Sequence, residues 1–229
     1  MEIQTGYPGW CSHSGDNQYR SAFAWQCERS KFLALSRQTT SQSAQPDSPR
    51  PIVALTGFMA AGKSTVGRVL ASLLRWRFID LDCEIECRSK LRIHELFASY
   101  GEPHFRRIEA DALRSVLEQT SAPTVIALGG GTFAEPQNAD LLRSSGAHVV
   151  FLELDIDELL RRCRTAGERS AQNPRPLAGD IEAFCALYAR RLPHYRKAEL
   201  IVKTAGNTAE QVAQQIETAL HLAAVKHGT

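Results

Sequence analysis

A short glycine-containing segment between an apolar run and an amphipathic run constrains the fold of this chain more than any other feature. The segment GFMAAGKS at residues 57–64 matches the phosphate-loop pattern G-x-x-x-x-G-K-[ST]. It follows the run PIVAL at 51–55 and precedes apolar residues at helical spacing, which are Val66, Val69, Leu70, Leu73 and Leu74. The pattern therefore predicts a strand, a phosphate-binding loop and a helix.

The residue types in this loop are those that bind a nucleoside triphosphate. Main-chain N–H groups and the positive end of the following helix can surround phosphate oxygens. We expect the Lys63 ammonium to reach the β- and γ-phosphates, the Ser64 hydroxyl to bind Mg²⁺, and the Thr65 hydroxyl to contact the α-phosphate. The predicted nucleotide-binding residues of the loop are Gly57, Ala60, Ala61, Gly62, Lys63, Ser64 and Thr65.

The remainder of the chain alternates short apolar runs with helical patterns. Strands are predicted at RFIDLD (77–82), TVIAL (124–128), AHVVFLEL (147–154) and ELIVKT (199–204). Helices are predicted from the end of RFIDLD through residue 97, over 104–119, in DIDELLRRC (155–163), over 184–191, and from residue 207 or 208 onward. This order predicts an α/β fold with a five-stranded parallel sheet, helices on both faces, and ligands at the carboxyl ends of the strands.

Composition limits the domain organisation and the possible partners. Residues 51–229 are expected to form one domain, in which a basic, proline-containing segment at about 164–180 interrupts the pattern. Residues 1–50 are polar and aperiodic and are expected to form a disordered extension; a targeting segment and a wrongly assigned start codon are the alternatives. The net charge of +2 argues against general nucleic-acid binding, and no apolar run approaches the length of a membrane span. The six scattered cysteines favour a reduced, cytoplasmic protein.

Several polar groups follow the predicted strands and could receive the phosphate. Asp80 and Asp82 lie two residues apart in FIDLD, so on one strand both carboxylates would project from the same side of the sheet; a helix cap or turn is the structural alternative. Arg106 and Glu109 could bind an anionic substrate or form an ordinary surface ion pair. The segment GGG at 129–131 could bring bare backbone close to a ligand or make a simple tight turn.

Taken in order, these motifs resemble those of one enzyme family. GFMAAGKSTVG, FIDLDCEIE, LFASYGEPHFRRIE, LGGGT, NPRPLAGD and RRLPHY are similar to segments of shikimate kinases, over a region from about residue 52 to the C-terminus. The resemblance implies a nucleoside-monophosphate-kinase-like fold with a mobile lid. It also implies a monomer that transfers the γ-phosphate of ATP to the 3-hydroxyl of shikimate with Mg²⁺.

The resemblance further implies a role for each matching residue. Asp82 would bind ring hydroxyls and act as, or near, the catalytic base, and Asp80 would hold magnesium through water. Arg106, oriented by Glu109, would bind the shikimate carboxylate. The other implied residues are Arg191 at the carboxylate, Gly130 at the substrate by its backbone, Arg175 over the transferring phosphoryl group and Arg164 near adenine.

Departures and rivals accompany this resemblance. Ala60 and Lys90 stand where the family usually has glycine, and TAGERSAQN makes the lid segment longer than is common. If Ala60 must take a positive φ, the cost would be about 1 kcal/mol. A gluconate or nucleotide kinase with the same loop is one alternative, although it would leave Asp82, Arg106 and Arg191 unexplained. A non-catalytic protein derived from a kinase is another, although none of the expected catalytic residues is lost.

Overall fold

The computed structural model describes residues 51–169 and 180–222, and these form an α/β structure built on one parallel sheet. The five strands are β1 (Ile52–Thr56), β2 (Arg77–Asp80), β3 (Thr124–Ala127), β4 (His148–Glu153) and β5 (Leu200–Lys203). They lie in the order β2-β3-β1-β4-β5, and all neighbours are parallel. The predicted fold class is therefore confirmed. The predictions for residues 1–50 lie outside the described residues.

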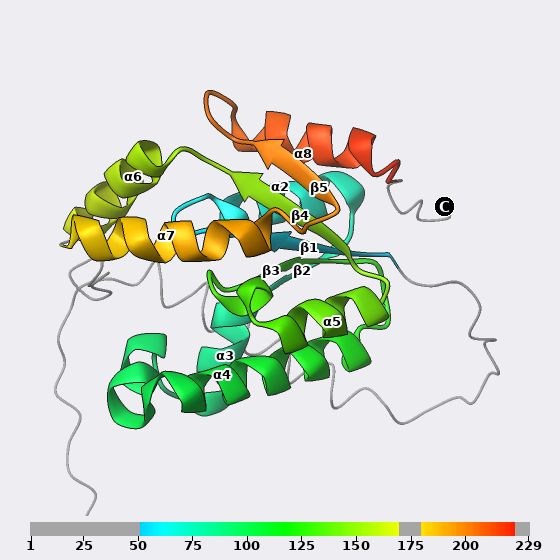
Figure 1. The fold of residues 1–229 in the computed structure, drawn as a ribbon. Helices are drawn as coiled ribbons and strands as arrows, with labels where there is room; N and C mark the ends of the chain where they lie inside the picture. The colour runs from blue at the N-terminus through cyan, green and yellow to red at the C-terminus, as the bar shows by residue number, and fades with distance from the viewer. Residues whose placement is uncertain (1–50, 170–179, 223–229) are drawn as a thin grey trace, which may run out of the picture. The chain divides into compact units, whose positions relative to one another are not determined.

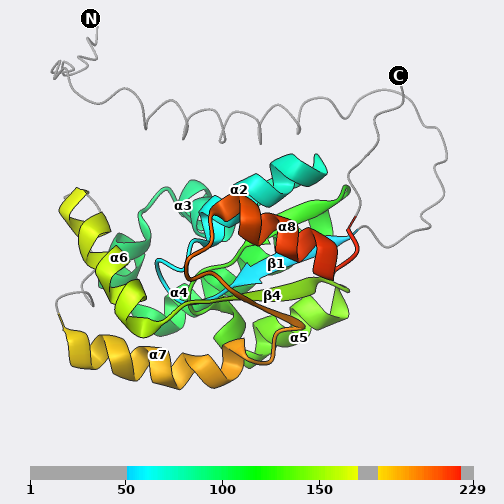
Figure 2. The same ribbon diagram turned by 90° about the horizontal axis from the view of Figure 1, so that it is seen from above.

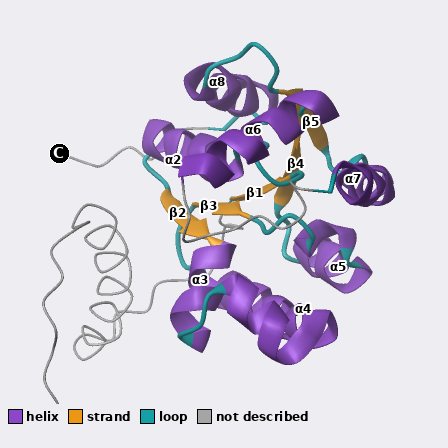
Figure 3. Ribbon diagram, turned by 90° about the vertical axis from the view of Figure 1, so that its left-hand side faces the viewer, coloured by secondary structure: helices purple, strands orange, loops and turns teal. Residues whose placement is uncertain are grey.

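Helices cover both faces of the sheet (Figures 1 and 3). One face carries α2 (Lys63–Leu74), α6 (Ile156–Arg169), α7 (Ile181–Tyr195) and α8 (Ala209–Ala219) around a core that includes Leu70, Phe151 and Ile216. The other carries α3 (Leu81–Ser89), α4 (Ile93–Gln119), the short 3-10 helix η1 (Thr132–Ala134) and α5 (Pro136–Ser144) around a second core. The view from above shows α2 and α8 side by side over β1 and β4 (Figure 2). Among the described helices, none is long and apolar enough to cross a membrane.

The sequence predicted most elements, but it missed α5 and several boundaries, among them those of α7, which was expected over 184–191. The strand predicted at 77–82 ends at Asp80, because the Asp80 side chain accepts a hydrogen bond from Cys83 N and caps α3. Helix α4 spans Ile93–Gln119, but Gly101 (φ 75°, ψ 171°) is non-helical and kinks it, which agrees with the two separate helices predicted there. Helix α6 continues to Arg169, through the beginning of the segment that the sequence assigned to a lid.

The last helix was expected to begin at residue 207 or 208, and the structure selects the second of these. Thr208 caps α8, since its hydroxyl accepts a hydrogen bond from Gln211 N at 3.3 Å. The Gln211 side chain in turn accepts from Thr208 N at 2.8 Å, which completes a capping box. Asn207 instead donates from its side chain to the carbonyls of Lys203 and Ala205.

Candidate active site

The phosphate loop lies at the carboxyl end of β1, the middle strand of the sheet, and leads into α2. Gly57 (φ 144°) and Gly62 (φ 95°) have backbone conformations that glycine favours, and a Cβ on Gly57 would approach the Leu152 carbonyl oxygen to 2.9 Å. Ala60 also takes a left-handed conformation, with φ 62°. Ala60 therefore takes the positive φ that was considered from the sequence, and the loop carries the corresponding conformational strain at this residue.

The charged and hydroxyl groups of the loop are already held in place. Lys63 Nζ donates to the carbonyl oxygens of Gly57 at 2.9 Å and Phe58 at 3.0 Å. Ser64 Oγ donates to Asp80 Oδ2 at 2.6 Å, so the start of α2 is joined to the end of β2. A lysine ammonium, a hydroxyl and a carboxylate thus converge beside the loop.

The Ser64–Asp80 pair fits a magnesium ion that arrives with a nucleotide. Hydroxyl and carboxylate oxygens are ligands that Mg²⁺ accepts, and it usually takes only one or two protein ligands in addition to phosphate and water. Among the described residues no cluster of three or more His, Cys, Asp or Glu side chains could hold a metal by itself. The donor set therefore suits a metal–nucleotide complex better than a permanently bound metal.

Asp82 lies close to Asp80, but on a different element from the one expected. It stands in the first turn of α3 rather than on β2, so the alternation of a strand does not place the two carboxylates. The side chain points toward the turn after β3, since a Cβ on Gly129 would lie 2.8 Å from Asp82 Oδ1. The cap at Asp80 and the first turn of α3 bring the two carboxylates together. Their local geometry is therefore that of the helix cap, which the sequence offered as the alternative to a shared strand face.

The environment of Asp82 favours its neutral form. The pKa of Asp82 is raised to about 6. The largest cause is desolvation by the surrounding protein, followed by the negative charges of Asp80, Glu109 and Glu86, while the positive charge of Lys63 acts in the opposite direction. The residue is nevertheless exposed by its solvent-accessible surface, so water offsets part of this effect. A carboxyl group with a raised pKa can accept a proton at near-neutral pH.

The three glycines at 129–131 join the separate parts of the site. A Cβ on Gly129 would also meet Glu109 Oε1 at 3.0 Å, and one on Gly131 would meet Arg106 Nη1 at 2.6 Å. At Gly130 the corresponding distances are 3.7 Å both to Arg191 Nη1 and to Met59 N in the phosphate loop. A side chain at Gly129 or Gly131 would displace the polar groups of Asp82, Glu109 or Arg106, and Gly130 lies between the phosphate loop and Arg191.

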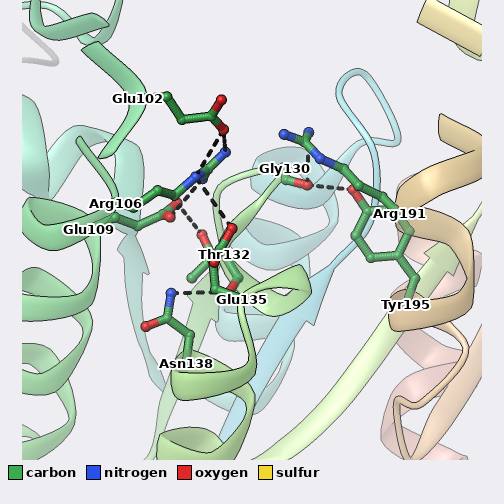
Figure 4. A network of polar contacts seen from close by, with 9 residues as sticks. All are labelled: Glu102, Arg106, Glu109, Gly130, Thr132, Glu135, Asn138, Arg191 and Tyr195. Carbon is green, nitrogen blue, oxygen red and sulfur yellow. Dashed lines mark hydrogen bonds and ion pairs between the residues drawn. The ribbon is translucent and has the colours of Figure 1, made fainter. Parts of the chain in front are cut away.

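Arg106 is held in a network on one side of this turn (Figure 4). Its Nη1 donates to Glu109 Oε2 at 2.8 Å, and Thr132 Oγ1 donates to the other oxygen of Glu109 at 2.6 Å. Asn138 Nδ2 donates to the Thr132 carbonyl at 3.1 Å. Burial lowers the pKa of Arg106, but its contacts with Glu109 and Glu102 more than offset this, so the pKa is raised. Arg106 thus stays charged and oriented.

Arg191 approaches the same turn from α7, on the opposite side (Figure 4). Its Nη1 donates to the Gly130 carbonyl at 3.3 Å, and the Tyr195 hydroxyl donates to the same oxygen. Burial raises the pKa of Tyr195 to about 12, so this hydroxyl remains a donor. The structure therefore brings Asp82, Arg106 and Arg191 around one three-glycine turn beside the phosphate loop.

Other predicted residues are placed differently or not at all. Arg164 lies on α6 and is exposed, and Arg175 lies outside the described residues. Sequence reasoning gave no role to Glu102, Thr132, Asn138 or Tyr195. Glu102, Thr132 and Tyr195 lie inside the quoted motifs LFASYGEPHFRRIE, LGGGT and RRLPHY, which was the available signal, whereas Asn138 lies outside them. A separate pocket, lined in part by Arg143, His194 and Lys197, contains none of the predicted site residues.

This parallel sheet, with a phosphate loop at its middle strand and acid and guanidinium groups along the same edge, defines a phosphate-loop small-molecule kinase. The family model for shikimate kinase matches residues 59–221. The chain belongs to the shikimate kinase family, an assignment that decides against the gluconate and nucleotide kinase alternatives.

Individual relatives agree with the family model. A shikimate kinase from Geobacter metallireducens is 41% identical over 180 residues, which cover 77% of this chain and 95% of the relative. One from Geobacter sulfurreducens is 40% identical over 184 residues, covering 80% and 96%. The solved structure of shikimate kinase from Acinetobacter baumannii in complex with shikimate is similar with a TM-score of 0.66 and 31% identity, covering 75% of this chain and 94% of that one.

Proposed function

We propose that this protein transfers the γ-phosphate of ATP to the 3-hydroxyl of shikimate, giving shikimate 3-phosphate and ADP. One observation carries the proposal: the Gly129–Gly131 turn contacts Asp82, Arg106 and Arg191 while also adjoining the phosphate loop. Shikimate has one carboxylate and three hydroxyls, which suit two guanidinium groups and one acid. The structural relative from Acinetobacter baumannii was solved with shikimate bound.

On the nucleotide side, residues 57–65 of the loop would hold the phosphates of ATP. The N–H groups at the start of α2 would face phosphate oxygens, and Lys63 would exchange its two carbonyl acceptors for the β- and γ-phosphates. Ser64 and, through water, Asp80 would hold Mg²⁺. When bound, this ion supplies positive charge that offsets the charge developing on the phosphates.

On the acceptor side, Asp82 would receive the proton of the attacking hydroxyl. The oxygen of that hydroxyl forms a bond to the γ-phosphorus while the bond from phosphorus to the β,γ-bridging oxygen breaks. Arg106 and Arg191 would bind the carboxylate, and Gly130 would contact the substrate through its backbone. Phosphoryl transfer depends on this alignment and on charge neutralisation more than on covalent chemistry by the protein.

Two arginines would complete the site from the lid, the segment expected at about 164–180. Arg175 would cover the transferring phosphoryl group, on the basis of the motif NPRPL alone, since it lies outside the described residues. Arg164 would contact adenine from α6, where its side chain is exposed and available to a ligand. Closure of this segment would exclude water that otherwise hydrolyses ATP.

The same proposal includes a cytoplasmic monomer with small-molecule partners only. The described cysteines Cys83 and Cys185 are free thiols, which suits a reducing compartment. The product would enter the shikimate pathway toward chorismate and aromatic amino acids. Size-exclusion chromatography with light scattering would measure the oligomeric state.

An acceptor panel tests the proposed activity. ADP formation by the full chain is followed with Mg-ATP and, in turn, shikimate, gluconate and nucleoside monophosphates. We expect turnover with shikimate alone and a product phosphorylated at the 3-hydroxyl by ³¹P NMR. Turnover with another acceptor and none with shikimate would overturn the proposal.

A further inference from the structure

Arg106 is surrounded by more negative charge than one guanidinium can neutralise (Figure 4). Its three carboxylate neighbours are Glu102 at 2.8 Å, Glu109 at 2.8 Å and Glu135 at 3.6 Å. With all three ionised, the group around Arg106 has an excess of two negative charges. Even when the positive charge of Arg191, across the turn, is counted, one negative charge is left over, so an anionic substrate binds more easily if one carboxylate moves away.

The three carboxylates differ in how firmly they are held. Glu109 is buried, with 1% of its side chain exposed, and both its oxygens accept hydrogen bonds, from Arg106 and Thr132. Glu102 is 57% exposed and has Arg106 as its hydrogen-bond partner. Glu135 is 45% exposed and its oxygen is too far from Nε for a hydrogen bond. Glu109 is therefore fixed, whereas Glu102 can leave at small cost.

Glu102 occupies the edge of the guanidinium that a second carboxylate would use. Its Oε1 accepts from Nε at 3.3 Å and from Nη2 at 2.8 Å, while Nη1 is engaged by Glu109. The Nε–Nη2 edge of arginine is one that binds carboxylates with two parallel hydrogen bonds. An exposed pair at i and i+4 typically contributes only about 0.5 kcal/mol. Gly101, the preceding residue, already breaks the helical conformation of α4.

We propose that Glu102 is a placeholder for the substrate carboxylate: it holds the Nε–Nη2 edge of Arg106 in the free enzyme and is displaced when the substrate binds. Glu109 keeps the guanidinium oriented throughout. Glu102 thereby weakens substrate binding by competition. This inference rests on the proposed function, because it requires an acceptor that carries a carboxylate at Arg106.

The alternative is that Glu102 belongs permanently to the binding site and helps Glu109 to orient Arg106. The two roles predict opposite effects of the isosteric variant Glu102→Gln. Removal of a competitor tightens binding of shikimate, whereas removal of an orienting group weakens it. Since Glu102 is exposed, the substitution leaves the fold intact.

The experiment measures KM for shikimate at saturating Mg-ATP and Kd for shikimate by calorimetry, with the full chain. For Glu102→Gln we expect both constants to fall about two- to fivefold with kcat unchanged, and the difference to shrink at high salt. Glu135→Gln is the matched control, since it removes the same charge near Arg106 without removing a hydrogen bond, and we expect a smaller decrease. Glu109→Gln should raise both constants.

A second substrate separates competition for the carboxylate from a general effect of charge. The methyl ester of shikimate keeps the ring hydroxyls and lacks the negative charge, so its KM should be the same for Glu102→Gln and the wild type. Constants for shikimate that are unchanged or higher in Glu102→Gln would overturn the placeholder role, and so would an equal decrease for the ester. Turnover of shikimate by the wild type would then still stand, so the proposed function would survive that result. If the wild type neither binds nor phosphorylates shikimate, both proposals fail.

Discussion

At the scale of single residues, the raised pKa of Asp82 affects both its proposed role as a proton acceptor and the pH dependence of the free energy of unfolding. Its pKa is raised from 3.8 to about 6 by the surrounding protein and then by the charge of Asp80. Between these two values the folded protein binds a proton that the unfolded chain releases. Stability associated with Asp82 is therefore present below about pH 4 and lost as the pH rises through about 6.

The first prediction concerns the pH dependence of activity. If Asp82 must be ionised to accept the hydroxyl proton, kcat/KM for shikimate at saturating Mg-ATP should fall below a midpoint near pH 6. An aspartate with an ordinary pKa would keep activity to about pH 4. An NMR titration of the Asp82 carboxyl carbon in the free protein gives an independent value. A kinetic midpoint near 4, or a titration near 4, would contradict this role for the raised pKa.

The second prediction concerns Asp82→Asn, which removes the charge and keeps the shape. We expect ATP to bind as in the wild type while kcat falls at least a hundredfold, because general-base catalysis commonly contributes that much. At pH 7.5 the variant should be more stable than the wild type by about 1 kcal/mol, a value reduced for the solvent access of the side chain, which corresponds to about 2–4 °C in Tm. The difference should shrink as the pH is lowered from 7 toward 4. Unchanged turnover would remove Asp82 from the mechanism.

The third prediction concerns the two residues that replace family glycines, Ala60 (φ 62°) and Lys90 (φ 61°). An L-residue in the left-handed region is strained by about 1 kcal/mol, so Ala60→Gly and Lys90→Gly should each raise the free energy of unfolding by up to that amount. Lys90 lies at the C-terminal cap of α3, outside the phosphate loop, and is the matched control. Only Ala60→Gly should change KM for ATP. A change of the same size in both variants would argue against a role for Ala60 in nucleotide binding.

At the scale of elements, the arginine on α7 offers a test of the carboxylate site. Arg191→Ala, the fourth prediction, should raise KM for shikimate at least tenfold and change kcat less, because the lost contact is made to bound substrate. Arg190→Ala is the control, since it removes the same charge from the neighbouring, exposed position on α7. Equal effects of the two substitutions would point to the general charge of α7 instead of a carboxylate contact. An unaltered KM in Arg191→Ala would contradict the role assigned to Arg191.

The sequence predicted the order of strands and helices well, because apolar runs and helical spacing reflect burial along one element at a time. It placed Asp82 on a strand because FIDLD continues the apolar alternation. The cap formed by Asp80 and Cys83 N, which starts α3 there, depends on local hydrogen bonding instead. Helix α5 was missed altogether, since PQNADLLRS has few apolar positions and buries Asn138. Hydrogen bonds between distant segments, such as Thr132 to Glu109, leave no periodic pattern in a sequence.

At the scale of the whole described domain, the site lies where the two packed layers meet. Arg106 comes from α4, which packs on the core that includes Leu113 and Ile126. Arg191 comes from α7, whose Phe184 and Tyr195 belong to the core on the other face of the sheet. The Gly130 carbonyl connects the turn after β3 to α7 through Arg191 and Tyr195. A ligand bound to both arginines therefore links helices from opposite faces of the sheet.

The fifth prediction follows from this arrangement. Shikimate at 100 times its Kd should stabilise the folded chain by about 2.7 kcal/mol, which for a protein of this size raises Tm by about 5–10 °C. Because the carboxylate contacts both helices, Arg106→Ala and Arg191→Ala should each remove about half of this shift or more at the same concentration of shikimate, since a tenfold rise in Kd leaves about 1.4 kcal/mol. A Tm shift with Mg-ATP should persist in both variants, since the phosphate loop is untouched. A shikimate shift retained in full by either variant would show that the ligand contacts one layer only.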